Sequence, residues 1–355
     1  MVWRMNTKNN LCCLKSLAFR LTDLCNLNCV FCGQAKQNKA EKTKNARHFL
    51  ELHELMAITD QVIQYKPQVY LWGGEPLVYP QLCEFITYLR KNKLNVFITT
   101  NGVLLDKFYE FFVDNKVTQL TVSIDGFKDA HEKARGVYGI YDKIIDNLRL
   151  LNDYKLKKRR VFPLVDINVI INEGNYQQLS GFCEYLSDLG VINRIRLQLP
   201  MFFSREASCE FENFVTKTFN VKNGTSWKYF TDDYKNIDLP VLKGELNQAL
   251  QNKKVQLFPP SAEVSEWFEK PNVRFQHNCR TAFERINIEP NGDLITCTDF
   301  TETTYGNALS DSIESLFNNE IINNHRKMLQ EKQLELCARC SHLYIYPEAQ
   351  VDNER

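Results

Sequence analysis

The sequence lacks the features that would place the protein in a membrane or direct it out of the cell. No apolar run in its 355 residues approaches the length that spans a bilayer. Its first residues, MVWRMNTKNN, lack the basic region and apolar stretch of a secretory signal. Lysine and arginine number 44 against 43 aspartates and glutamates, so charge gives no argument for nucleic acid or an anionic membrane as a partner. We therefore expect a cytoplasmic protein that binds no membrane, with nucleic acid an unlikely partner.

Cysteine, in contrast, is abundant, with twelve residues in the chain. Without an export signal, this number favours reduced thiols and metal ligation over disulfides. Seven of the twelve fall into two sets with ligand-like spacing. The others are expected to be core or surface thiols: Cys12, Cys13, Cys83, Cys183 and Cys209.

The first set is Cys25, Cys29 and Cys32, in the run TDLCNLNCVFCG. Such close spacing lets three thiolates converge on one four-iron cube, as ferredoxin-type runs do, and leaves the fourth iron open for a substrate. The alternative is a structural zinc, which needs a fourth ligand nearby. His48 is the nearest downstream histidine, and it lies outside the usual zinc spacings.

Between Ser16 and Pro200, short β-rich runs alternate with helical patterns, which is typical of βαβ units around a parallel sheet. The predicted strands are Leu17–Leu21, Gln68–Trp72, Asn95–Thr99, Gln119–Ile124, Val165–Ile171 and Arg194–Leu199. The predicted helices are Leu50–Tyr65, Gln81–Lys91, Asp106–Asn115, Tyr141–Tyr154 and Tyr176–Leu189. Because parallel barrels carry their chemistry where strands end, the motifs that follow these strands are candidates for a site.

The second set is Cys279, Cys297, Cys337 and Cys340, with seventeen residues between the first two and a C-x2-C pair at the end. Four thiolates close a cube, so this set would suit electron transfer better than substrate binding. A zinc ribbon is the alternative, because four paired cysteines also make a tetrahedral zinc site. An Asn-Gly pair at 291–292 predicts a hairpin here, and a helix is expected from Ser312 to Gln330.

Taken together, the triplet, the GGEP run at 73–76 and the second cysteine set resemble the radical SAM superfamily with a C-terminal SPASM or twitch appendage. The resemblance implies an α/β fold, a partial (β/α)6 TIM-like barrel with a small auxiliary-cluster domain. Its divisions would be an N-terminal extension at 1–15, the barrel at 16–200, a bridge at 201–278, the cluster domain at 279–345 and a tail at 346–355. The implied cofactors are a [4Fe-4S] cluster on three cysteines, an auxiliary [4Fe-4S] cluster on four, and S-adenosylmethionine (SAM).

The resemblance also assigns SAM contacts, although each residue has an ordinary structural alternative such as a turn, a loop anchor or a strand hydrogen bond. Phe31 matches the family's aromatic residue near the adenine, and Arg135 is a candidate for the methionyl carboxylate. Backbone groups of the GGEP glycines can approach the SAM ammonium closely. The full set of predicted contacts is Phe31, Gly73, Gly74, Glu75, Pro76, Asn101, Ser123, Asp125, Arg135 and Asn168.

The implied function is reductive cleavage of SAM to a 5'-deoxyadenosyl radical, hydrogen abstraction from a substrate, and electron transfer through the auxiliary cluster. Asp299 and Glu302 follow Cys297 closely and are candidates for a base that deprotonates the substrate radical. A low-potential donor such as flavodoxin or ferredoxin would supply electrons. Maturation of a peptide or natural product is the favoured role, and dehydrogenation of a small-molecule alcohol such as a sugar or aminocyclitol is the alternative. A zinc-stabilised binding protein without catalysis is the competing class.

Overall fold

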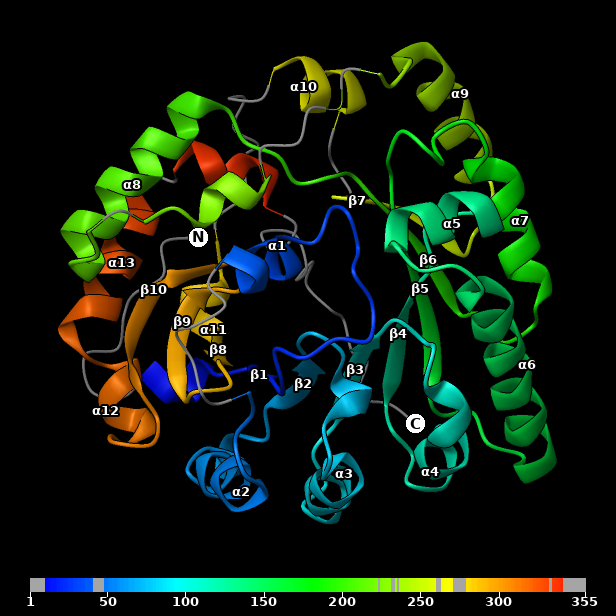
Figure 1. Ribbon diagram of the computed structural model, residues 1–355. Coiled ribbons are helices and arrows are strands. Elements are labelled where there is room, and N and C mark those ends of the chain that lie inside the picture. The colour runs from blue at the N-terminus through cyan, green and yellow to red at the C-terminus, as the bar shows by residue number, and fades with distance from the viewer. Residues whose placement is uncertain are drawn as a thin grey trace.

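The computed structural model describes residues 10–40, 48–222, 224–230, 234, 236–259, 263–270, 279–331 and 334–340. These residues form one ten-stranded sheet with the order β10-β9-β8-β1-β2-β3-β4-β5-β6-β7 (Figure 1). Every neighbouring pair from β8 round to β7 is parallel, whereas β9 pairs antiparallel with both β8 and β10. The strands are β1 (Ser16–Arg20), β2 (Gln68–Trp72), β3 (Val96–Thr100), β4 (Gln119–Ser123), β5 (Leu164–Ile170), β6 (Arg194–Gln198), β7 (Val255–Phe258), β8 (Arg285–Ile288), β9 (Asp293–Cys297) and β10 (Phe300–Asn307).

The predicted α/β class is confirmed, and the six predicted strands coincide with β1 to β6 to within one residue at each end. Two further parallel strands extend the arc that these six form. Strand β7 pairs with β6, and β8 returns from the C-terminal part of the chain to pair with β1. The sheet is therefore continuous across the boundaries expected at residues 200 and 278, which remain a prediction as domain limits.

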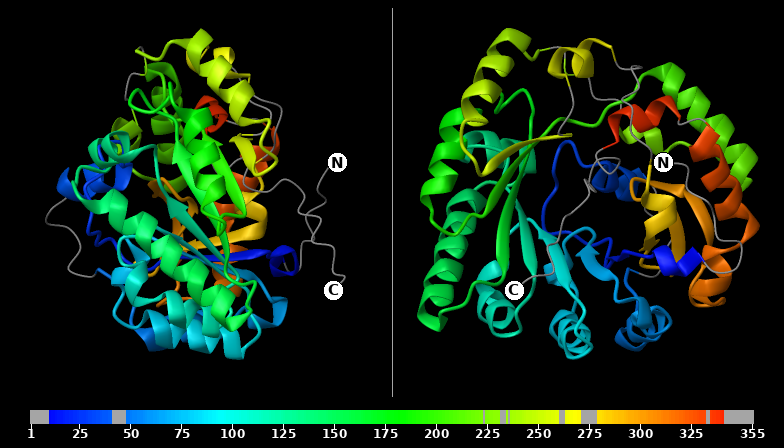
Figure 2. Two further views of the ribbon diagram at one scale, coloured as in Figure 1. Left: turned by 90° about the vertical axis from the view of Figure 1, so that its right-hand side faces the viewer. Right: turned by 180° about the vertical axis from the view of Figure 1, so that it is seen from behind.

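The described helices lie mostly along the outer side of this arc, although α1 lies inside it in the views of Figures 1 and 2. They are α1 (Gly33–Ala40), α2 (Leu52–Asp60), α3 (Leu82–Lys91), α4 (Tyr109–Asp114), α5 (Lys128–Arg135), α6 (Ile140–Lys158), α7 (Leu179–Asp188), α8 (Arg205–Phe219), α9 (Leu239–Ala249), α10 (Val264–Glu269), α11 (Thr281–Glu284), α12 (Ile313–Phe317) and α13 (Glu320–Glu331). Single 3₁₀ turns are η1 (Asn10–Cys13), η2 (Ile63–Tyr65), η3 (Pro76–Val78), η4 (Leu105–Lys107), η5 (Ser226–Phe230) and η6 (Glu335–Arg339).

Several helical predictions need correction. The expected helix Leu50–Tyr65 ends as α2 at Asp60 and is followed by the separate turn η2, the expected helix Asp106–Asn115 is divided into η4 and α4, and α5 was not predicted. The expected helix from Ser312 to Gln330 is broken into α12 and α13, because Asn319 turns its side chain to the backbone between them. Its amide donates to the carbonyl of Tyr305, and its side-chain oxygen accepts from the N–H of Ile322. Helix α8 was missed within the bridge, although Ser204 caps it and Phe211 and Phe214 bury one of its faces.

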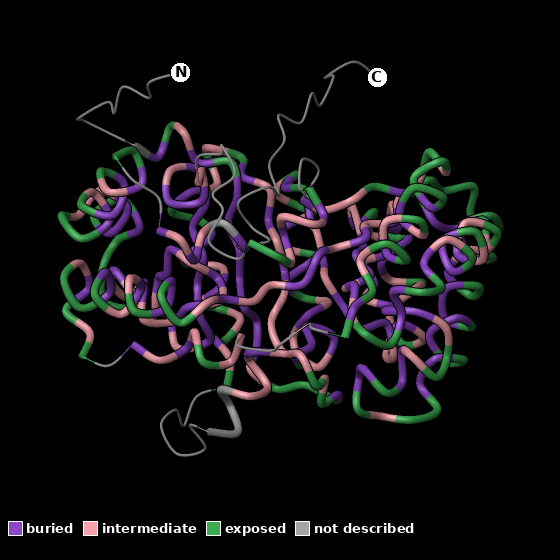
Figure 3. The backbone as a smooth tube through the Cα atoms, turned by 90° about the horizontal axis from the view of Figure 1, so that it is seen from above, coloured by how far each residue is buried: buried purple, intermediate pink, exposed green. Residues whose placement is uncertain are grey.

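Alternation along the strands gives the arc two different faces. In β6, Ile195 and Leu197 are fully buried, while Arg194, Arg196 and Gln198 are partly exposed. The same pattern holds in β2, whose Val69 and Leu71 are buried between partly exposed neighbours. Apolar side chains thus form the core, and in Figure 3 the exposed stretches lie mostly at the periphery of the molecule and the buried ones inside. The alternate positions, which are polar or aromatic, lie on the other face of the sheet.

The hairpin predicted at the Asn-Gly pair is confirmed, since β8 and β9 are antiparallel and Gly292 has a φ of +88°. The predicted tail at 346–355 and most of the extension at 1–15 lie outside the described residues. Within the part of the chain that is described, no helix combines the length and the hydrophobicity that crossing a membrane requires.

Candidate functional site

A cavity of about 330 Å³ opens at the carboxyl ends of the parallel strands. Cys25, Cys29 and Cys32 all line it, on the loop that follows β1. Most of the predicted SAM contacts line it as well: Phe31, Gly73, Gly74, Glu75, Asn101, Ser123, Arg135 and Asn168. Residues from strands and loops more than 100 positions apart in the sequence are therefore brought to one place, as the strand-end argument predicts.

The two glycines after β2 hold the start of the cysteine loop. The N–H of Gly74 donates to the carbonyl of Thr22 at 2.8 Å, and the N–H of Glu75 donates to that of Leu24 at the same distance. A Cβ atom on Gly74 would lie 2.1 Å from the Leu24 oxygen, and one on Gly73 would lie 2.4 Å from the Thr22 oxygen. Glycine is needed here because backbone meets backbone, immediately before Cys25.

Glu75 is buried and ties this turn to the end of β3. Its carboxylate accepts hydrogen bonds from the hydroxyl of Thr100 at 2.7 Å, the N–H of Asn101 at 2.7 Å and the N–H of Leu77 at 3.0 Å. Burial raises the pKa of Glu75, while these three bonds oppose the rise. Asn101 in turn donates to Asn26 within the cysteine loop at 2.8 Å. The motif thus builds the walls of the cavity.

Arg135, at the end of α5, lies against the cysteine loop. Its guanidinium carbon is 5.3 Å from the centre of the Phe31 ring, and Nη1 is 3.7 Å from the Cys29 sulfur. Nη2 forms a 2.6 Å ion pair with Asp125, whose other oxygen accepts from the N–H of Ile170. Burial raises the pKa of Asp125, although Arg135 opposes the rise.

Two predicted SAM contacts do not line the cavity. Asp125 lies behind Arg135, where its carboxylate is fully buried, so it orients the guanidinium rather than meeting a ligand directly. Pro76 is buried as the first residue of η3. Its fixed φ suits the start of that turn, which explains its place in the motif without a ligand contact.

The second cysteine set surrounds a smaller cavity, of about 40 Å³. Its four members come from three segments: Cys279 precedes α11, Cys297 ends β9, and Cys337 and Cys340 lie in and after η6. The rest of the lining is mainly apolar and includes Phe211, Phe214, Phe300, Leu329, Leu334 and Leu336. All four predicted ligands are therefore brought together.

Burial governs the protonation of these thiols. It raises the pKa of Cys297 to about 12, and the neighbouring Cys279 adds to the rise. Burial also raises the pKa of Cys337 and Cys340 well above the usual value, again with contributions from the other cysteines of the set. Four thiols that repel one another as thiolates call for a cation between them, since metal ligation favours the deprotonated form.

Burial also raises the thiol pKa values in the triplet. It raises the pKa of Cys25 to about 11, and it raises the pKa of Cys29, where the positive charge of Arg135 opposes the rise. Nowhere in the described ranges do three His, Cys, Asp or Glu side chains converge as closely as ligands of a single ion do. Each cysteine set is instead spaced around a cavity. Three thiols on one wall and four around the other supply the ligand numbers of an open and a closed iron–sulfur cluster.

The two candidate bases differ in their surroundings. Asp299 lines both cavities. Burial raises its pKa to about 6, with Arg20 and Arg285 opposing the rise. Glu302 lines neither, and it is held by Ser226, whose N–H donates to one carboxylate oxygen at 2.7 Å and whose hydroxyl donates to the other. The structure therefore keeps Asp299 as a candidate and gives Glu302 a structural role.

Sequence reasoning missed the remaining polar lining of the first cavity. The part of it on strands includes Tyr70, Thr99, Thr100, Thr121, Arg196, Gln198 and Arg285, and Gln34 and Tyr234 add to it from outside the sheet. The available signal was the alternation in runs such as RIRLQ, where two charged residues and a glutamine occupy every second position. In a parallel strand covered by helices, such alternation indicates a polar inner face.

Comparison with protein-family models gives two matches. Residues 19–186 match the Radical SAM superfamily, and residues 279–341 match SPASM, an iron-sulfur cluster-binding domain. The second range begins at the first cysteine of the four and includes the other three. The first contains the triplet and the GGEP turn.

Among curated proteins, the chain is 31% identical over 182 residues to the AdoMet-dependent heme synthase of Methanosarcina barkeri, covering 50% of this chain and 48% of that protein. It is 25% identical over 190 residues to the probable GTP 3',8-cyclase of Methanocaldococcus jannaschii, covering 53% of this chain and 60% of that one. The chain thus spans about half the length of the curated relatives it matches.

Among solved structures, Streptococcus suis SuiB bound to precursor peptide SuiA matches with a TM-score of 0.64 at 17% identity, over 93% of this chain and 71% of that one. Native anSMEcpe with bound AdoMet and Cp18Cys peptide gives a TM-score of 0.59 at 16% identity, over 93% and 87%. At these identities the likeness establishes the fold.

Proposed function

This chain belongs to the radical SAM superfamily of enzymes and carries a SPASM domain, and we propose that it uses SAM to make a radical that modifies a peptide. One observation carries the proposal. The three-cysteine cavity and the four-cysteine cavity adjoin each other, with Asp299 in the lining of both. Substrate held in the first cavity would lie within reach of both cofactors.

Cys25, Cys29 and Cys32 would hold a [4Fe-4S] cluster with one open iron, and the other four cysteines would hold a closed one. When these groups are bound, the first supplies a 5'-deoxyadenosyl radical from SAM and the second accepts or donates one electron. The protein itself positions the cofactors and the substrate and shields them from solvent. The glycines of the GGEP turn fix the loop that carries Cys25, and Glu75 fixes the neighbouring wall.

Arg135 is the proposed receptor for the SAM carboxylate. It lies beside Cys29 and Phe31, and its fork geometry suits a carboxylate. Asp125 holds the fork in place from behind. Phe31, Asn101, Ser123 and Asn168 remain proposed contacts for the rest of SAM, supported by their positions in the lining of the same cavity.

Asp299 is the proposed acceptor of the proton that a substrate loses after hydrogen abstraction. The support is its place between the two cavities, where a substrate radical and the route to the second cluster would meet. Glu302 is not proposed for this role, because Ser226 already occupies both of its carboxylate oxygens.

The relatives favour a peptide as substrate. Relatives named for heme synthesis and GTP cyclisation match only about half of the chain, so these matches alone do not determine the substrate. Structures that match over 93% of the chain include two solved with bound peptides, SuiB with SuiA and anSMEcpe with Cp18Cys. An external low-potential donor such as flavodoxin or ferredoxin is part of the proposal.

The test begins with anaerobic reconstitution, followed by assays of iron, sulfide and zinc. Incubation with SAM and dithionite should then yield 5'-deoxyadenosine, and mass spectrometry of candidate peptides should reveal a changed mass. Zinc at both sites and no 5'-deoxyadenosine would favour a metal-stabilised binding protein instead. If a sugar or aminocyclitol gives product and no peptide does, the proposed peptide substrate is wrong and the protein is a small-molecule dehydrogenase.

A further inference from the structure

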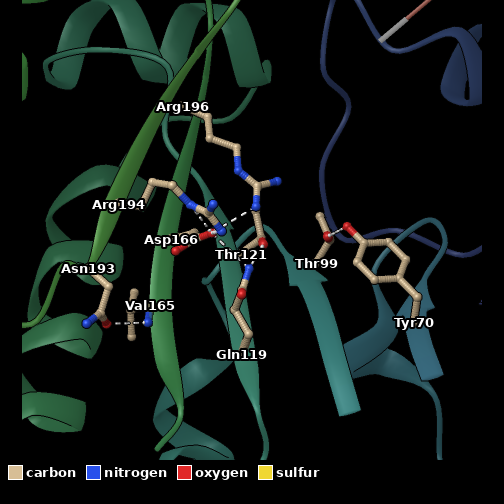
Figure 4. A network of polar contacts seen from close by, with 9 residues as sticks. All are labelled: Tyr70, Thr99, Gln119, Thr121, Val165, Asp166, Asn193, Arg194 and Arg196. Atoms are coloured by element: carbon tan, nitrogen blue, oxygen red, sulfur yellow. Dashed lines mark hydrogen bonds and ion pairs between the residues drawn. The ribbon is translucent and has the colours of Figure 1, made fainter. Parts of the chain in front are cut away.

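The inner face of β5 and β6 carries more positive than negative charge. Asp166 is buried on β5 and meets Arg194 and Arg196 from the neighbouring strand β6 (Figure 4). A single carboxylate therefore faces two guanidinium groups. The cluster has a net charge of about +1 within the wall of the barrel.

All the contacts to Asp166 converge on one carboxylate oxygen. Oδ2 accepts from Nε and Nη2 of Arg194 at 2.9 and 2.6 Å, from Nη2 of Arg196 at 2.9 Å, and from the amide of Gln119 at 2.8 Å. Arg194 therefore has the two-point contact, and Arg196 only a single one. In the described part of the chain, this is the one hydrogen bond that Arg196 donates.

Arg196 lines the first cavity, whereas Arg194 is absent from its lining. Asp166 is the strand partner of Arg194, and Asn168 is that of Arg196. The guanidinium of Arg196 therefore extends toward the amino end of β5 to reach Asp166. Asn168 and its strand partner Ser123, which we propose as SAM contacts, lie two residues nearer the carboxyl ends of the strands. Arg196 thus marks a position deeper in the cavity than the SAM contacts.

On the opposite wall, a second cation already has a counter-charge. Arg285, on β8, lies over the ring of Tyr70 at 5.1 Å. Its positive charge opposes the rise in the pKa of Asp299, which lines the same cavity. The hydroxyl of Tyr70 forms a hydrogen bond with the hydroxyl of Thr99, with 2.5 Å between the two oxygens. Of the arginines that line this cavity, Arg196 is therefore the one that shares its only carboxylate within the described ranges with another arginine.

We propose that Arg196 binds a carboxylate of the substrate, a deduction that rests on the peptide-modifying function proposed above. A partly buried guanidinium offers its remaining N–H groups to the cavity, and a planar carboxylate fits that fork. A carboxylate has one negative charge and would neutralise the cluster, whereas a phosphate monoester has nearly two. Asp166 orients Arg196 and is a positioning residue.

The test measures the binding of three blocked tripeptides to the reconstituted protein with SAM present, by ligand-observed NMR. Acetyl-Ala-Glu-Ala amide carries a side-chain carboxylate, acetyl-Ala-Ala-Ala a terminal one, and acetyl-Ala-Gln-Ala amide none. We expect at least one acidic peptide to bind about tenfold more tightly than the glutamine peptide, because hydrogen bonds between two charged groups are stronger than those to a neutral amide. Whichever acidic peptide binds better identifies the source of the carboxylate.

Two variants localise the effect. R196Q should remove the preference for the acidic peptide while still binding SAM, and R194Q, which alters the same cluster outside the cavity, should keep the preference. Equal binding of all three peptides to the wild type would overturn the proposal, as would an unchanged preference in R196Q. Loss of SAM binding in R196Q would assign Arg196 to the SAM carboxylate and would also overturn it.

Two further measurements separate this inference from its alternatives. If acetyl-Ala-phosphoserine-Ala amide binds more tightly than both acidic peptides, the site recognises phosphate and the carboxylate assignment is wrong. Formation of 5'-deoxyadenosine by the wild-type protein is measured in parallel. A protein that cleaves SAM but shows no acidic preference contradicts this inference alone, whereas one that never cleaves SAM contradicts the proposed function.

Discussion

The two cysteine cavities differ in size, exposure and surroundings. The first has a volume of about 330 Å³, is lined by polar strand residues and includes the exposed Cys25. The second has about 40 Å³ and is lined mainly by phenylalanine and leucine. The first can admit SAM and substrate, and the second has little room beyond the group that its four cysteines would hold. In the function proposed above, this contrast corresponds to one centre that carries out chemistry on bound molecules and another that exchanges electrons.

Removing the first centre should have the largest effect. In the C25A/C29A/C32A variant we expect no detectable 5'-deoxyadenosine, because no thiolates remain to hold the cluster that binds SAM. Iron content should fall from about eight atoms per chain to about four, since each [4Fe-4S] cluster has four irons. Colorimetric analysis measures the iron content per chain, and chromatography measures the 5'-deoxyadenosine formed. Complete loss of iron would show that the two centres do not assemble independently.

Removing the second centre should affect product and stability instead. The C337A/C340A variant loses two ligands in a buried apolar cavity, so we expect the C-terminal part to be destabilised, because ligation stabilises the fold that gathers the ligands. SAM cleavage should persist without formation of the modified peptide. Thermal unfolding, nucleoside assay and peptide mass spectrometry measure the three effects. Normal product from this variant would contradict the electron-transfer role.

Asp299 and Glu302 give a matched test of the region between the cavities. D299N should lower product formation by about 100-fold or more while 5'-deoxyadenosine still forms, because general base catalysis contributes roughly that much. E302Q should keep the activity and lose about 1 kcal/mol of stability, since it weakens the hydrogen bonds to Ser226. Peptide turnover and urea unfolding separate the two results. Undiminished product from D299N would eliminate Asp299 as the base.

A smaller effect on product formation than that of D299N is expected from changing the glycine that supports the first cavity. G74A places a Cβ atom 2.1 Å from the Leu24 carbonyl oxygen, so the cysteine loop must shift, at a cost of about 1–3 kcal/mol. We expect weaker SAM binding, measured by equilibrium dialysis. G181A is the control, because a Cβ on this glycine of α7 meets nothing within 4 Å. Equal SAM affinity in both variants would show that the contact of Gly74 with the loop does not position the site.

Much of this organisation could be predicted because it is local in the sequence. The period of two in the strands and the spacing of the cysteines depend on residues only a few positions apart. The interaction of Gly74 with Leu24 could not be predicted this way, because it joins residues fifty positions apart across two strand ends. The ion pair of Asp125 with Arg135 could not be predicted for a similar reason, since it depends on the packing of α5.

The pairing of Asp166 with Arg194 and Arg196 depends on the register between β5 and β6, which no local pattern specifies. The polar alternation in β6 could have indicated a polar inner face. It could not have indicated which charged residues that face brings together. Helix α8 had the expected apolar period and was missed because its segment also contains irregular stretches. Long-range contacts, rather than element types, thus limited the prediction.

Electron paramagnetic resonance of the dithionite-reduced protein tests the division between the two centres most directly. We expect signals from two [4Fe-4S] clusters, of which one changes when SAM is added, and that one should be missing from the C25A/C29A/C32A variant. A SAM-dependent change in the cluster held by Cys279, Cys297, Cys337 and Cys340, or no change in either signal, would contradict the account.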